Sequence, residues 1–289
     1  MEPFLAISFF LIGLAFGSFL NVCISRLPRD LSIIVPRSYC PACRTPIAWR
    51  DNLPVLSWVL LRGRCRACRE PILLRYPAVE FLTGLLFLAC YSSFGLSGMT
   101  LKACVLCFLL VGLIFMDAET GLLPAEFTYP GIVLGLLFAW FVPGDSTGAR
   151  FLLSAFGGHA LPSPAVLSLL DAVAAAACGA GFFFVAWAVY YLVRKRDGLG
   201  FGDIALMAMV ASFLGLKLTV IVIFLAPVTA TLYAIGLLLT RPRGLSAGDS
   251  AQGSILSLSL PFGAFLGGCA LAALFAGDAI WRWYLGFFH

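Results

Sequence analysis

Charged residues are scarce in this chain, and histidine is almost missing from it. Of its 289 residues, 11% are charged, 61% are hydrophobic, and only His159 and His289 are histidines. An ordinary soluble domain has about a quarter of its residues charged and about half apolar, so this composition excludes that class and predicts a polytopic membrane protein. Both histidines fall outside the apolar runs, so we do not expect chemistry based on histidine.

Apolar runs long enough to cross a bilayer as helices recur along the whole chain. We predict about eight of them, and therefore an all-α polytopic membrane protein. The sixth and seventh runs are separated at Gly215-Leu216-Lys217. The predicted spans are Phe4–Ile24, Pro77–Phe94, Leu101–Met116, Phe127–Val142, Val166–Val193, Ile204–Leu214, Leu218–Leu239 and Leu256–Ala276.

The positive charges indicate how these spans are oriented, because short cytoplasmic loops retain Lys and Arg. The segment between the first two spans holds ten arginines, and alternation from there assigns 15 basic residues to the cytoplasmic side and four (Lys102, Arg150, Lys217 and Arg282) to the outside. We therefore expect both termini outside.

Residues 1–24 are interpreted as a first span and not a signal peptide, since the positive charge follows the apolar run. The ten arginines are Arg26, Arg29, Arg37, Arg44, Arg50, Arg62, Arg64, Arg66, Arg69 and Arg75.

Four cysteines form two C-x2-C pairs in the polar segment 25–76, at Cys40 with Cys43 and at Cys65 with Cys68. Two such pairs can surround one tetrahedral ion, so their spacing predicts a structural zinc site. A segment of about fifty residues buries little apolar surface, and a metal is a common remedy. Disulfides are the alternative, which a reducing cytoplasm disfavours.

The remaining cysteines fall within or at the ends of the predicted spans. Cys104 and Cys107 repeat the C-x2-C spacing inside an apolar run without a second pair, and we interpret them as core residues. Cys23, Cys90, Cys178 and Cys269 are assigned no chemistry.

Two aspartates lie at the cytoplasmic ends of predicted spans, Asp117 at the end of the third and Asp203 at the start of the sixth. A carboxylate in or near hydrocarbon is costly and is read by default as functional. Either residue could instead be solvated or cap a helix. Gly198, Gly200 and Gly202 precede Asp203, and they permit unusual φ values and close approach of another chain.

Paired carboxyl groups can hydrolyse a peptide bond. One must be ionised to deprotonate water and the other protonated to polarise the carbonyl group. Two acids held close together share one proton because like charges repel. Asp117 and Asp203 could take these roles in an aspartyl protease, and the sequence does not say which is the base.

Several motifs, in order along nearly the whole chain, resemble the bacterial type IV prepilin peptidase and N-methyltransferase family. The resemblance implies that Asp117 and Asp203 are catalytic, with Gly200 and Gly202 supporting the active-site backbone. It implies cleavage of prepilins or pseudopilins after a Gly at the cytoplasmic face of the inner membrane, followed by methylation of the new N-terminus from S-adenosylmethionine. The motifs are Gly17-Ser-Phe-Leu-Asn-Val22, Arg26-Leu-Pro28, the cysteine pairs, Asp51-Asn-Leu-Pro-Val-Leu-Ser-Trp58, Arg62-Gly-Arg-Cys65, Arg75-Tyr-Pro-Ala-Val-Glu80, Met116-Asp117 with Leu122-Leu-Pro124, and Gly200-Phe-Gly-Asp203.

The methyltransfer site rests on the resemblance alone, with Gly63, Arg64 and Glu80 as its candidate residues. Glu80 could instead pair with a loop arginine or cap its own helix. The domain division that follows is a first span (1–24), a four-cysteine domain (25–76) and a transmembrane peptidase domain (77–289). One departure concerns Leu123-Pro124-Ala125-Glu126, where the family usually has an Asp directly after Leu-Pro.

Two alternatives stay open. A basic patch with a zinc site could indicate nucleic acid, but juxtamembrane arginines also follow from topology and anionic lipid. We favour the lipid bilayer as partner and expect no nucleic acid. The alternative function is a non-proteolytic zinc-ribbon membrane protein, either a methyltransferase only or an assembly partner of a pilus or secretion machine, in which the aspartates only cap helices.

Overall fold

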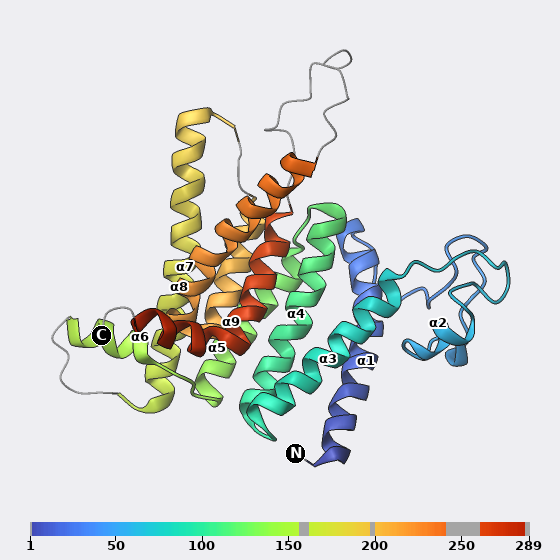
Figure 1. Cartoon of the computed structure of the whole chain (residues 1–289), viewed down its shortest axis with the longest axis horizontal. Coiled ribbons are helices and arrows are strands. Elements are labelled where there is room, and N and C mark those ends of the chain that lie inside the picture. Colours follow the sequence, from blue (N-terminus) through green and yellow to red (C-terminus); the bar gives the residue numbers. More distant parts are fainter. Residues whose placement is uncertain (1, 156–161, 197–199, 241–260, 287–289) are drawn as a thin grey trace.

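The computed structural model describes residues 2–155, 162–196, 200–240 and 261–286, and within these ranges the chain is helical without a β-strand (Figure 1). The all-α prediction is confirmed. The α-helices are α1 (Pro3–Arg26), α2 (Leu56–Leu60), α3 (Arg75–Phe94), α4 (Gly98–Thr120), α5 (Ala125–Phe141), α6 (Thr147–Ala155), α7 (Pro164–Arg194), α8 (Phe201–Thr240) and α9 (Phe262–Leu285), with short 3-10 turns at Leu27–Arg29 and Trp49–Asp51.

Each predicted span coincides with a helix or with part of one. Six described helices are long and apolar enough to cross a membrane (α1, α3, α4, α7, α8 and α9), whereas α5 is apolar but has only 17 residues. The sixth and seventh spans are joined in α8, which has 40 residues and a break at Gly215. The predicted start of the last span, Leu256, lies outside the described residues.

The two limbs of α8 fold back beside each other at this break. Met207 of the first limb and Thr219 of the second both lie next to Gly179 of α7, although a straight helix would separate them by about 18 Å. Gly215 adopts φ 76° and ψ 173°, a backbone conformation that is essentially restricted to glycine. The boundary expected at Gly215-Leu216-Lys217 is therefore a real turn.

The core of the bundle is built around α4. Its residues Leu106, Leu110, Leu113 and Met116 are fully buried, and they pack with residues from α1, α3, α8 and α9. This burial fixes α4, which carries Asp117 near its end. The end of α4 and the starts of α8 and α9 gather at the upper end of the bundle in Figure 1, and the four-cysteine segment lies to one side.

The connection between α5 and α7 differs from expectation in one respect. Its composition predicts a flexible tether over Gly144–Pro164. Residues 147–155 instead form α6, whose Ala149 is buried and whose backbone is tied to α7. This part of the connection is structured because Asp171 of α7 accepts a hydrogen bond from it.

Candidate active site and metal centre

Asp117 lies in the last turn of α4 and is 6% exposed. Its Oδ2 atom accepts a hydrogen bond of 2.8 Å from the backbone N–H of Ala264, in the first turn of α9. The N-terminal N–H groups of a helix have no partner within that helix and favour a negative charge. Asp117 therefore caps a helix other than its own, which the sequence did not indicate.

Asp203 lies in the first turn of α8 and is 8% exposed. Its Oδ1 atom is buried and has no hydrogen-bond partner among the described residues, and Oδ2 lies beside Gly200. The charges of Asp117 and Asp203 interact. The fold thus brings together two buried carboxyl groups that are 86 positions apart in the sequence, and it leaves one oxygen free.

Small residues surround this pair. Gly202 and Gly263 both face Leu123, from the loop between α4 and α5, and a Cβ atom on either glycine would lie within about 3 Å of it. Gly202 is not among the described glycines with a positive φ. Gly202 permits the close approach of Leu123. Gly198 lies outside the described residues.

The end of α4 is also fixed from the side. Arg75 at the start of α3 forms a 2.5 Å ion pair with Glu119, two residues beyond Asp117. The Arg75 guanidinium also stacks on the ring of Tyr76, 4.5 Å from its centroid. The ion pair joins the start of α3 to the end of α4, and the contact with Tyr76 orients the Arg75 guanidinium.

The four predicted metal ligands converge. The sulfur atoms of Cys40, Cys43, Cys65 and Cys68 all lie within 4.8 Å of one another, and those of Cys40 and Cys68 are 3.8 Å apart. A tetrahedral zinc ion with Zn–S bonds of about 2.3 Å places its sulfur atoms about 3.8 Å apart. The four thiols therefore fit a single metal ion.

Local backbone geometry builds this cluster twice. In the first pair the Cys40 N–H donates to Thr45 and the Arg44 N–H donates to Cys40, and in the second Cys65 and Arg69 make the equivalent bonds. The Thr45 hydroxyl and N–H lower the pKa of Cys43 to about 6. Backbone N–H groups of Cys68 and Ala67 lower the pKa of Cys65. At Cys68 the Glu70 backbone N–H lowers the pKa, but burial and the three neighbouring thiols outweigh it and raise the pKa to about 12. Local hydrogen bonds therefore favour the thiolate form, which metals bind, at Cys43 and Cys65 but not at Cys68.

The candidate methyltransfer residues make contacts within the chain. The Val55 N–H donates to Glu80 Oε2 at 2.7 Å, so Glu80 links the four-cysteine segment to α3. The partner of Glu80 is thus a backbone N–H of that segment, and not a loop arginine or the end of its own helix. Gly63, with φ 65°, packs against the Trp58 ring. Arg64 pairs with Pro71 in an isolated bridge. None of these contacts links Glu80 directly to Gly63 or Arg64.

The remaining cysteines in α4 are core residues, as predicted. Cys104 and Cys107 are buried, and both belong to a small cluster with Cys90 and Phe87. The sulfur atoms of Cys90 and Cys107 are 3.7 Å apart. Sequence spacing alone therefore does not distinguish a metal-binding pair from a packed one, whereas the surrounding polarity does.

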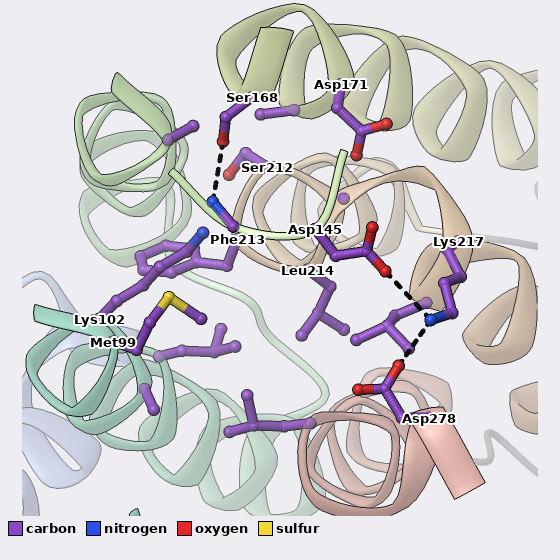
Figure 2. Close-up of a pocket in the computed structure, with 18 of the residues that line it drawn as sticks. Met99, Lys102, Asp145, Ser168, Asp171, Ser212, Phe213, Leu214, Lys217 and Asp278 are labelled. Atoms are coloured by element: carbon purple, nitrogen blue, oxygen red, sulfur yellow. Dashed lines mark hydrogen bonds and ion pairs between the residues drawn. The ribbon is translucent and has the colours of Figure 1, made fainter. Parts of the chain in front are cut away.

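A second group of buried ionisable residues lies at the opposite end of the bundle, around a cavity of about 130 Å³ (Figure 2). Lys102, counted above among the outer charges, is 7% exposed within α4. Asp171 of α7 is 2% exposed, and its two oxygens accept from the N–H groups of Ala149 (2.6 Å) and Leu216 (2.9 Å). Sequence reasoning missed Asp171, although a carboxylate inside the apolar run Val166–Val193 was a visible signal.

Lys217 also lines this cavity and links three segments around it. Its ammonium group forms ion pairs with Asp145 (3.1 Å) and Asp278 (2.7 Å), as Figure 2 shows. Burial raises the pKa of Asp145, but hydrogen bonds from Thr147 and the Lys217 charge outweigh it and hold that pKa below its usual range. These groups join the α5–α6 connection, the second limb of α8 and α9.

The fold and site together define a membrane protein with two interacting, buried carboxyl groups at one end of its helices and a four-thiol cluster beside them. Family models match both parts: the bacterial peptidase A24 N-terminal domain over residues 11–94 and the type IV leader peptidase family over residues 104–235. The chain belongs to the type IV leader peptidase family.

Several curated relatives support this assignment. Proteins named prepilin leader peptidase/N-methyltransferase are 39% identical in Myxococcus xanthus (86% of this chain, 68% of that protein) and 36% identical in Aeromonas hydrophila (96% and 92%). One from Neisseria gonorrhoeae is 30% identical, covering 86% of this chain and 88% of that protein. No solved structure matches the chain.

Proposed function

We propose that this chain is a membrane-embedded aspartyl endopeptidase that removes the basic leader of a type IV prepilin or pseudopilin after a Gly, and that it then methylates the new N-terminus. The observation that carries the peptidase half is the pairing of Asp117 and Asp203, two buried and interacting carboxyl groups. The name of its relatives, prepilin leader peptidase/N-methyltransferase, supports both halves, and it does not favour the non-proteolytic alternative.

The surroundings of the two carboxyl groups suggest how they divide the work. Asp117 accepts an N–H at the start of α9, which favours its ionised form, so it serves as the base that takes a proton from water. Asp203, with its unpartnered Oδ1, holds the shared proton and donates toward the carbonyl oxygen of the scissile bond. The water oxygen bonds to the carbonyl carbon to form a gem-diol. The C–N bond then breaks as the leaving amine takes the proton held by Asp117, and a hydroxyl of the diol returns its proton to Asp203 as the new carboxyl group forms.

The positive charges support a sidedness for this reaction. The segment between α1 and α3 holds ten arginines, and retention of such charge in the cytoplasm puts the four-cysteine segment and the carboxyl pair on the cytoplasmic side of the inner membrane. Both termini then lie outside. A substrate with a basic leader and an apolar helix would present its junction at that membrane face.

Cys40, Cys43, Cys65 and Cys68 would hold one structural zinc ion, because four converging thiols complete a closed tetrahedral site. Bound there, zinc would supply folding energy to the four-cysteine segment and no open coordination position for catalysis. Purified protein should contain about one zinc per chain. Cys40→Ser with Cys65→Ser should remove it, whereas Cys178→Ser, a change at an exposed cysteine outside the cluster, should not. Equal zinc in all three proteins would contradict the assignment.

The methyl donor would be S-adenosylmethionine, as the N-methyltransferase part of the relatives' name suggests. Gly63, Arg64 and Glu80 remain its candidate contacts. All three are engaged with the chain itself, so we derive no transfer step through them.

Mass spectrometry of a prepilin substrate tests the proposal directly. The substrate is incubated with the full-length protein in membranes, with S-adenosylmethionine added. Wild-type protein should release the leader and add one methyl group (about 14 Da) to the product. Asp117→Asn should leave the substrate intact, with a fall in cleavage rate of about 10²–10⁴-fold or more. Cleavage by that variant at the wild-type rate would contradict the assigned role, and absence of cleavage by wild type would contradict the proposed function.

A further inference from the structure

Leu123 occupies a special place beside the two carboxyl groups. It lies in the short loop between α4, which ends at Thr120, and α5, which begins at Ala125. Gly121 ends α4 with a left-handed residue, φ 65°. Its neighbour Leu122 is 52% exposed, whereas Leu123 packs against the main core. The loop thus directs one leucine outward and the next toward the active site.

Leu123 fills the space between the beginnings of α8 and α9. Its Cβ and Cδ1 atoms lie 2.9 and 3.3 Å from the position that a Cβ atom on Gly202 would take, and Cδ1 lies 3.0 Å from the equivalent position on Gly263. That position on Gly263 is also 3.0 Å from Asp117 Oδ2. One leucine side chain, two glycine backbones and a reactive carboxyl group therefore meet at one place.

This arrangement limits what can lie next to the scissile bond. A water molecule that attacks the bond must be within about 3 Å of the base, so the reacting carbonyl group lies close to Asp117. Leu123 follows the end of α4 and lies on the side of the carboxyl pair away from the middle of the helices. In the proposed reaction, the polar leader of the substrate would approach from that side, with the apolar part of the substrate along the helices.

We propose that Leu123 is a specificity-determining residue that restricts the position before the scissile bond to glycine. Its side chain takes up the volume that a Cβ atom of the substrate would need beside Asp117 and Gly263. This inference rests on the proposed function and deepens it. A shorter side chain at position 123 opens room for one methyl group, and a single methylene in an apolar pocket changes specificity by about 10–200-fold.

The test compares two prepilin substrates that differ only in the residue before the scissile bond, glycine or alanine. The measured quantity is the ratio of kcat/KM for the alanine substrate to that for the glycine substrate, with full-length protein in membranes. Leu123→Ala should raise this ratio by about tenfold or more over wild type. Leu122→Ala, a matched change at the exposed neighbour, should leave it unchanged.

An unchanged ratio in a folded Leu123→Ala protein would overturn the inference, because a leucine that only supports packing lowers both rates equally. If Leu123→Ala does not fold, Leu123→Val gives the same ratio with less volume removed, and it should raise the ratio by a smaller factor. An unchanged ratio there would also overturn the inference. Failure of wild type to cleave the glycine substrate would refute the proposed function itself, which distinguishes the two.

Discussion

Asp203 and Asp171 are both buried carboxyl groups, at opposite ends of the same bundle, and their partners differ. Both oxygens of Asp171 accept backbone N–H groups, at 2.6 and 2.9 Å. Asp203 has a buried oxygen without a partner in the described part of the chain, and it interacts with the charge of Asp117. Burial is thus shared by the two residues, whereas their hydrogen-bond partners and neighbouring charges differ, since Asp171 interacts with Asp145 and Lys102.

The difference indicates distinct roles. A buried polar group is costly unless it is hydrogen-bonded, so the fully bonded Asp171 stabilises the turn between the limbs of α8 and its contact with α6. An unpartnered oxygen at Asp203 is a cost that the fold retains, which is common where a group must act on a substrate. We infer that the cavity end of the bundle stabilises the fold and propose that the other end carries the chemistry.

The largest expected effect on stability is at Gly215, where the cavity end depends on the backbone. Gly215→Ala would place a Cβ atom 2.4 Å from Asp171 Oδ2 at φ 76°, and we expect a loss of about 2–5 kcal/mol. Thermal unfolding of protein in lipid nanodiscs, followed with a thiol-reactive dye, would measure it.

Gly236→Ala is the matched control on the same helix, since nothing lies within 4 Å of its Cβ position. It should be neutral or stabilise by less than about 1 kcal/mol. Equal unfolding temperatures for the two variants would show that the turn at Gly215 is not a structural requirement.

Replacing Asp171 with Asn should have an intermediate effect. The N–H groups of Ala149 and Leu216 bond different oxygens of Asp171, and the amide replaces one of these oxygens with an NH2 donor, so one N–H loses its acceptor. A buried N–H left without a partner costs about 1–3 kcal/mol. We expect a lower unfolding temperature and a nearly unchanged cleavage rate at temperatures where the variant is folded. Loss of cleavage in the folded variant would contradict the purely structural role that we assign to Asp171.

The smallest effect is expected at Lys217, which bridges Asp145 and Asp278 near the surface. Partly exposed ion pairs contribute about 0.2–1 kcal/mol each. Lys217→Met should therefore lower the unfolding temperature slightly, and the difference from wild type should shrink at high salt. A difference that does not depend on salt would mean that packing of the lysine stem is what matters.

Local patterns made much of this structure predictable. Apolar run length located the six described helices that are long and apolar enough to cross a membrane, and the C-x2-C spacing located the four thiols, because both signals depend on residues close in sequence. Gly215 also marked the turn in α8. Asp117 and Asp203 could be named because a carboxylate at the end of an apolar run is unusual.

Features that depend on packing between distant segments were not predictable. The Ala264 N–H that binds Asp117 is 147 positions away, and nothing in the sequence of either residue indicates the contact. The same holds for Leu123 between Gly202 and Gly263, and for Lys102, which looks like an outer-loop charge but is buried. Asp171 was overlooked, although the criterion that selected Asp117 applied equally to it.

The most direct test of the contrast is to measure cleavage rate and unfolding temperature together for Asp203→Asn and Asp171→Asn in the same membrane preparation. We expect Asp203→Asn to lose cleavage by about 10²–10⁴-fold or more while its unfolding temperature stays close to wild type. Asp171→Asn should keep a cleavage rate close to wild type and have a lower unfolding temperature. If Asp203→Asn cleaves at the wild-type rate, or loses activity only because it unfolds, the assignment of chemistry to the carboxyl group with the unpartnered oxygen is wrong.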